Sequence, residues 1–151
     1  MRLLKNTCAV LAFAALLFGQ FGCSTTKELM SSIQFDQSAL NTDKKIKADS
    51  LALLDRARDR APYSGVSADV DQLMQKIDKA ITSEQARTKN VPTVEQWKAI
   101  KAQLTKLFDQ WKTKGSFSPA FVDQYKTQVT ELFDTLIKTE EDKQKSTAPK
   151  P

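Results

Sequence analysis

The stretch PTVEQWKAIKAQLTKLFDQWKTKG, residues 92–115, indicates most directly how this chain folds. Its large apolar residues recur in alternating steps of three and four, which places them on one stripe of an α-helix. Thr93 and Gln96 have the spacing of a capping box, so we expect the helix to begin at Thr93. Gly115 follows Lys112 and Lys114 and is expected to end the helix. The stripe consists of Trp97, Ile100, Leu104, Leu107, Phe108 and Trp111.

Three further segments carry helical patterns. Residues 66–81 repeat apolar side chains along a single stripe, with Ser67 as the expected N-cap. Residues 118–138 begin with Ser118 as cap and Pro119 in the first helical position. Residues 43–60 have near-helical apolar spacing and are expected to stop before Pro62.

The expected fold class is all-α, because no run alternates apolar and polar residues for long enough to form a strand. Four helices joined by short links predict an antiparallel up-and-down bundle over residues 43–138. The alternative is three well-formed helices with the segment 43–60 loosely docked. Residues 23–42 are polar and are expected to form a flexible tether. The charged residues 139–151, which end in proline, are expected to be a disordered tail.

The N-terminus has the pattern of an export signal. Arg2 and Lys5 precede an apolar run over residues 9–18, followed by a small residue at a polar boundary. About ten apolar residues are too few to cross a bilayer, which needs about twenty. Residues 1–22 are therefore expected to be a signal peptide.

The boundary Gly22-Cys23-Ser24 resembles the cleavage box of bacterial lipoproteins. In that class a small residue precedes a cysteine that becomes the mature N-terminus and carries acyl chains such as palmitate. Here Gln20 stands where the class usually has leucine, and Phe21 is bulkier than usual. The resemblance implies lipidation at Cys23 and a place in the cell envelope. Since Ser24 is not aspartate, it also favours the outer membrane over the inner one, on the periplasmic or the surface side. Simple secretion with an unlipidated Cys23 is the alternative.

The composition of the chain excludes several classes of partner and of catalytic site. The formal net charge is +5, and the signal segment removes two positive charges, which leaves about +3 and does not predict a nucleic-acid partner. The chain has no histidine, which excludes Ser-His and Cys-His catalytic pairs and the usual histidine metal sites. Cys8 falls in the signal and Cys23 is the expected lipid site, so the mature fold is expected to have no thiol and no disulfide. We expect no cofactor, no metal and no enzymatic activity.

Candidate contact residues are sparse. Trp97 and Trp111 with Tyr125 could form an aromatic groove, although a stripe of this kind is more typical of a core. Lys98 and Lys101, with Lys112, could face an anionic ligand, although a solvated helix face gives the same pattern. Arginines 56, 58 and 60 could form a docking patch, although cations also suit the C-terminal end of a helix.

The function favoured by these features is a non-enzymatic lipoprotein of the cell envelope, in which a membrane-tethered helical module binds another protein. Such a module should expose an apolar patch beyond a few hundred square ångströms. The alternative is a small hydrophobic or anionic ligand bound between helices near Trp97 and Lys101. An exclusion or immunity role in the envelope is a special case of the first function, and no residue selects it.

Overall fold

The computed structural model describes residues 34–147, which form an antiparallel four-helix bundle. The helices are α2 (Gln37–Arg58), α3 (Ser67–Ala86), α4 (Val91–Lys114) and α5 (Pro119–Thr147), with a 3₁₀ turn η1 (Tyr63–Gly65) after α2. No strand occurs within this range. The predicted all-α bundle is therefore confirmed.

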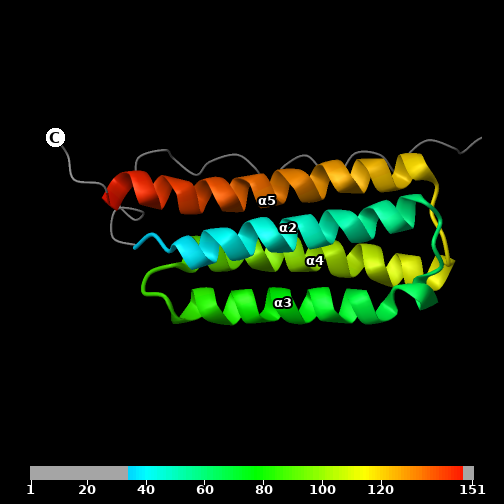
Figure 1. The fold of residues 1–151 in the computed structure, drawn as a ribbon, viewed down its shortest axis with the longest axis horizontal. Helices are drawn as coiled ribbons and strands as arrows, with labels where there is room; N and C mark the ends of the chain where they lie inside the picture. Colours follow the sequence, from blue (N-terminus) through cyan, green and yellow to red (C-terminus); the bar gives the residue numbers. More distant parts are fainter. Residues whose placement is uncertain (1–33, 148–151) are drawn as a thin grey trace, which may run out of the picture.

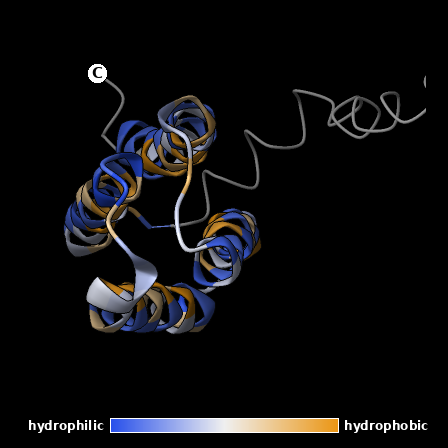
Figure 2. Ribbon diagram, turned by 90° about the vertical axis from the view of Figure 1, so that its right-hand side faces the viewer, coloured by the Kyte–Doolittle hydropathy of each residue, from blue (hydrophilic) through white to orange (hydrophobic). Residues whose placement is uncertain are grey.

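The four helices run side by side along the long axis of the molecule (Figure 1). Seen end-on, they surround a common interior (Figure 2), and the buried apolar residues of all four helices form one cluster there. Each helix contacts the next one along the chain, and α2 also lies against α5, where the contact between helices is most extensive. The first helix is thus an integral part of the bundle, and the loosely docked alternative is wrong.

The two ends of the bundle differ in what they carry. The tether end contains the first described residue, Gln34, the α3–α4 connection and the C-terminus of α5 (Figure 1). The distal end contains the α2–α3 and α4–α5 connections. The described part of the chain therefore begins at the tether end.

The core follows the predicted stripes. Trp97 packs edge-on against Phe133, with ring centroids 5.8 Å apart at 88°. Each α-helix contributes to one continuous apolar cluster, whose largest members are Trp97, Trp111, Phe133, Leu54, Leu73, Ile77, Ile100, Leu104, Leu107 and Leu136. Burial of these stripes is what drives the helices together, since helices of this length gain most of their stability from packing.

The first helix begins earlier than predicted. Asp36 caps α2, and its Oδ1 accepts hydrogen bonds from the backbone N–H groups of Ser38 at 2.7 Å and Ala39 at 3.3 Å. Leu40 and Asp43 are buried against the bundle. The predicted tether over residues 23–42 is wrong for its last six residues, because a capped turn continues the buried face.

Two further predicted caps are wrong. Asn90 precedes α4, and Thr93 lies buried inside the helix, where its Oγ1 donates to Asn90 Oδ1 at 2.9 Å. Gln96 donates to Thr139 on α5 at 2.9 Å and does not reach back to the start of its own helix. Ser67 is the first residue of α3, whose N-cap position is Val66. Tertiary packing has replaced the local capping that the sequence pattern predicted.

The connection between α4 and α5 is formed as predicted. Gly115 ends α4 with φ of 77°, a left-handed conformation suited to glycine, and its N–H donates to Trp111 O at 2.8 Å. Pro119 begins α5, and Ser118 Oγ accepts from the N–H of Phe121 at 3.4 Å.

The last helix is much longer than predicted. It continues to Thr147, and Thr139, Glu140 and Lys143 are buried. The expected disordered tail from residue 139 is therefore wrong as far as residue 147, because polar residues there pack against other polar residues.

The predicted signal segment and Cys23 lie outside the described residues. Within 34–147, no helix is both long and apolar enough to cross a bilayer.

Candidate functional site

The two tryptophans do not contribute to a surface. Trp97 and Trp111 are each 0% exposed. The indole N–H of Trp111 donates to the backbone carbonyl of Ala61 at 3.0 Å, which allows the whole ring to be buried. The prediction that Trp97 and Trp111 form part of a partner or ligand surface is wrong, and both residues belong to the core.

Tyr125 lies in an aromatic row at the distal end, and this row remains partly exposed. Phe117 is buried, whereas Phe121 and Tyr125 are half-buried. Ring centroids are 4.7 Å apart between Phe117 and Phe121 and 4.9 Å apart between Phe121 and Tyr125. The Lys114 ammonium lies 6.0 Å from the Phe121 ring centroid. We call Phe117, Phe121 and Tyr125 the distal aromatic row.

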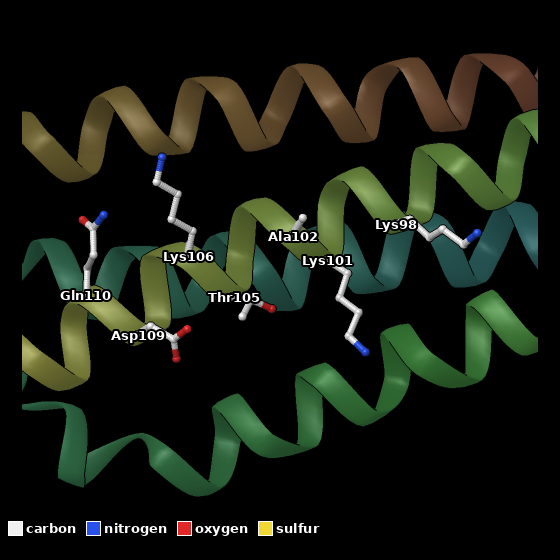
Figure 3. Close-up of a pocket in the computed structure, with 7 residues that line it drawn as sticks. All are labelled: Lys98, Lys101, Ala102, Thr105, Lys106, Asp109 and Gln110. Carbon is white, nitrogen blue, oxygen red and sulfur yellow. The ribbon is translucent and has the colours of Figure 1, made fainter. Parts of the chain in front are cut away.

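Lys98 and Lys101 lie on the outer side of α4, and both are engaged in ion pairs. Lys98 pairs with Glu95 on the same helix at 2.7 Å, and Lys101 pairs with Asp78 on α3. Figure 3 shows Lys101 extending toward α3 and Lys106 toward α5.

A shallow, open depression covers this face of α4. It does not include either tryptophan, so this depression is not the site between helices that was expected near Trp97 and Lys101. The depression is lined by Lys98, Lys101, Ala102, Thr105, Lys106, Asp109 and Gln110 (Figure 3).

The arginines at the end of α2 hold helices together. Arg56 pairs with Asp69 and also donates to the Gly65 carbonyl at 3.0 Å. Arg58 pairs with Asp123 on α5 at 2.8 Å. These contacts join α2 to both of its neighbours, which favours a structural role for Arg56 and Arg58 over a docking patch.

A buried polar cluster that the apolar stripes did not predict lies at the tether end. All four helices or their flanking residues contribute, and we call this set the tether-end cluster. It consists of Asp43, Glu84, Arg87, Asn90, Thr93, Glu140 and Lys143.

Lys143 lies at the centre of this cluster and is 0% exposed. Its ammonium donates to Asn90 Oδ1 at 2.8 Å and to Thr93 Oγ1 at 2.9 Å, and it forms an ion pair with Glu140. Asn90 in turn donates to Glu84. A buried ammonium is tolerated only with such partners, because leaving a charge unpaired in the interior is very unfavourable.

Arg87 and Glu140 connect the cluster to the chain that enters the bundle. Arg87 forms ion pairs at 2.8 Å with both Glu84 and Glu140, and it donates to the Gln34 carbonyl. Glu140 accepts from the Asp36 N–H at 2.9 Å. Burial acts to raise the pKa of Glu140, but the hydrogen bonds from Arg87, Lys143 and the Asp36 backbone outweigh it and lower the pKa.

Asp43 is the poorly satisfied member. It is 2% exposed, and its Oδ2 has no hydrogen-bond partner. Burial raises the pKa of Asp43 to about 7, and the nearby carboxylates of Glu84 and Glu140 add to the effect. Lys143 and Arg87 oppose this shift but do not cancel it.

The cluster can therefore hold one proton near neutral pH. Its three carboxyl groups face the two cations Arg87 and Lys143, so the charges balance when Asp43 is protonated and one negative charge is left over when it is ionised. Within residues 34–147, no group of three aspartate, glutamate, cysteine or histidine side chains is arranged to hold a metal ion.

The cluster had a signal in the sequence. The stripe of α5 runs through Val129, Phe133 and Leu136 in steps of four and three, and the same steps lead to Glu140 and Lys143. The stripe of α3 leads in the same way from Ala80 to Glu84 and Arg87. Polar residues at core positions of several helices at one end of a bundle indicate a buried network.

Comparisons with known proteins give no relative for this chain: no protein-family profile, curated protein or solved structure matches it.

Proposed function

We propose that this chain is a lipid-anchored helical module of the bacterial cell envelope, held at Cys23, that acts by binding another protein. The observation that supports it best is that Gln34, the first described residue, lies at the tether end and follows Cys23 by only eleven residues in the sequence. Even when fully extended, this connection spans at most about 40 Å.

A short connection gives the module an orientation. With Cys23 acylated, the tether end lies toward the membrane and the distal end faces away from it. More than one acyl chain is needed for stable anchoring, since a single chain binds reversibly. Because residue 24 is serine, the outer membrane is the proposed location in an organism that has one.

The surface available for a partner differs from the one expected. Among residues 34–147, Val91 at 66% is the exposed large apolar side chain, so the expected apolar patch is not present. The best remaining candidate is the distal aromatic row, where Phe121 and Tyr125 are half-buried beside Lys114. Aromatic side chains flanked by cations are typical of contact sites on protein surfaces.

The anchor is tested by growing cells with an alkyne analogue of palmitate. The wild-type protein should be labelled and should sediment with membranes, whereas Cys23→Ala should be unlabelled and released from them. Equal membrane association of wild type and Cys23→Ala, with no label in either, would contradict the anchor.

The partner surface is tested in the native host with a photocrosslinking amino acid in place of Tyr125. A discrete adduct should form with one envelope protein, and the same amino acid at exposed Lys79 on α3 serves as the matched control. Adducts of equal yield at both positions would show that contact at the distal aromatic row is not specific.

A second candidate function is the binding of an anionic ligand on α4. The depression beside Lys98, Lys101 and Lys106 is the observation that favours it (Figure 3). Since Lys98 and Lys101 already pair with carboxylates, a ligand would have to displace Glu95 and Asp78. Titration with anionic vesicles separates the two functions, because Lys106→Glu should weaken vesicle binding and leave the Tyr125 adduct unchanged.

A further inference from the structure

The tether end combines a buried excess of carboxylates with the segment that leads to the anchor. Asp43 on α2 faces Glu84 of α3, Arg87 just after it, and Glu140 and Lys143 of α5. The residues contributed by α4 and its start, Thr93 and Asn90, are polar but carry no charge. No charged group from α4 therefore offsets an ionised Asp43.

The same groups hold the entering segment in place. Arg87 donates to the carbonyl of Gln34, and Glu140 accepts from the N–H of Asp36. Both side chains also take part in the ion pairs of the cluster. Any rearrangement that brings water to the cluster must loosen these two contacts as well.

We propose that the tether-end cluster is a proton-dependent latch, closed while Asp43 carries a proton and opened when that proton is lost. An ionised Asp43 adds a third carboxylate to an interior in which Arg87 and Lys143 already pair with Glu84 and Glu140. Solvent entry relieves it by parting the first turns of α2 from the last turns of α5. The contacts of Arg87 with Gln34 and of Glu140 with Asp36 are thereby released.

Water entry should restore Asp43 to its ordinary titration. If the carboxyl titrates near 3.8 in the open form and near 7 in the closed form, opening is favoured about 30-fold more at pH 8 than at pH 5.5. The chain contains no histidine, which removes the usual source of a transition in this range.

The test is hydrogen–deuterium exchange of the full-length protein in detergent at pH 5.5 and pH 8, with intrinsic exchange rates divided out. In the wild type, amides of residues 37–46 and 136–147 should lose protection about 30-fold at the higher pH, while those near Gly115 do not change. Asp43→Asn should keep high protection at both pH values.

Two variants serve as checks. Asp71→Asn alters an exposed carboxyl on α3 and should keep the wild-type response. Asp43→Ala also removes the ionisable group and should be as insensitive to pH as Asp43→Asn, even if it is less stable. Equal protection of the wild type at both pH values, or an unchanged pH response in both Asp43 variants, would overturn the proposal. Because the readout does not depend on acylation, the latch can fail while the anchor at Cys23 stands, and the reverse.

Discussion

The global stability of the bundle should fall as pH rises through the range in which Asp43 titrates. The perturbation is Asp43→Asn, which keeps the size of the side chain and removes its charge. The carboxyl has an ordinary pKa of 3.8 and a pKa of about 7 in the folded protein. This difference corresponds to about 4 kcal/mol between the two protonation states.

The sign follows from which state holds the proton. Between pH 4 and pH 7 the folded chain keeps the Asp43 proton and the unfolded chain releases it, so raising the pH favours unfolding. Below this range both states are protonated and stability is highest. Above it both are ionised and the loss is complete. About 3 kcal/mol of the loss falls between pH 5 and pH 8.

Other titratable groups contribute little to the change in stability between pH 5 and pH 8. The lowered pKa of Glu140 gives a stabilisation that is lost only as pH falls below about 4.5, the ordinary value for that carboxyl. Burial raises the pKa of Tyr63 above its ordinary value of 10, so this group does not titrate below pH 8. Asp43→Asn should therefore remove most of the dependence of stability on pH.

The assay is urea unfolding followed by circular dichroism at pH 5, 6, 7 and 8, on the chain from residue 24 onward. The wild type should lose about 3 kcal/mol over this range, and Asp43→Asn should lose less than about 1 kcal/mol. A wild type of constant stability would refute the reasoning, and so would a variant that keeps the full slope.

Three further predictions concern stability at a single pH and use the same unfolding assay. Lys143→Met should destabilise the bundle by about 3–5 kcal/mol, because it removes one partner of a buried ion pair. The control Lys138→Met removes one partner of an exposed ion pair and should change the stability by less than about 1 kcal/mol. Similar losses in both variants would mean that Lys143 is not buried as described. Trp111→Phe should lower the free energy of unfolding by about 1 kcal/mol more than Trp97→Phe does, because Trp111 donates to the Ala61 carbonyl and the Trp97 N–H has no hydrogen-bond partner. The opposite order would contradict these contacts. Gly115→Ala should lower the stability by about 1 kcal/mol because of the left-handed backbone at this position alone, since a Cβ there meets no atom within 4 Å. Gly65 does not have a positive φ, so the control Gly65→Ala should lower the stability by less.

The fold class could be predicted from the sequence because the apolar stripes alone determine it. Leu73 and Ile77 on α3 and Leu104 and Leu107 on α4 are all fully or nearly fully buried. A helix with one apolar face must cover that face, and four such helices with short links have few ways to do so.

The extent of the helices could not be predicted in the same way, because the buried residues at the end of α5 are polar and do not continue the apolar stripe. Glu140 and Lys143 occupy core positions, although each residue type alone is typical of a solvent-exposed surface. Their burial depends on Arg87 and Asn90, which reach them from another part of the chain. A buried polar network is a property of the assembled bundle, so local composition predicted a disordered tail instead.

The candidate surface was misjudged for a related reason. An aromatic stripe does not reveal how deeply each of its members lies. Trp97 and Trp111 are both fully buried, although the Trp111 N–H donates to Ala61, fifty residues away in sequence, and the Trp97 N–H has no partner. Tyr125 stays half-buried. The sequence could identify the aromatic residues but not which of them reach the surface.

The central claim, an acyl anchor at Cys23, is tested most directly by mass spectrometry of the mature N-terminus. Trypsin should release a peptide that begins at Cys23, ends at Lys27 and carries the added mass of acyl chains. Recovery of an unmodified Cys23, or of a mature chain that starts at any other residue, would contradict the claim.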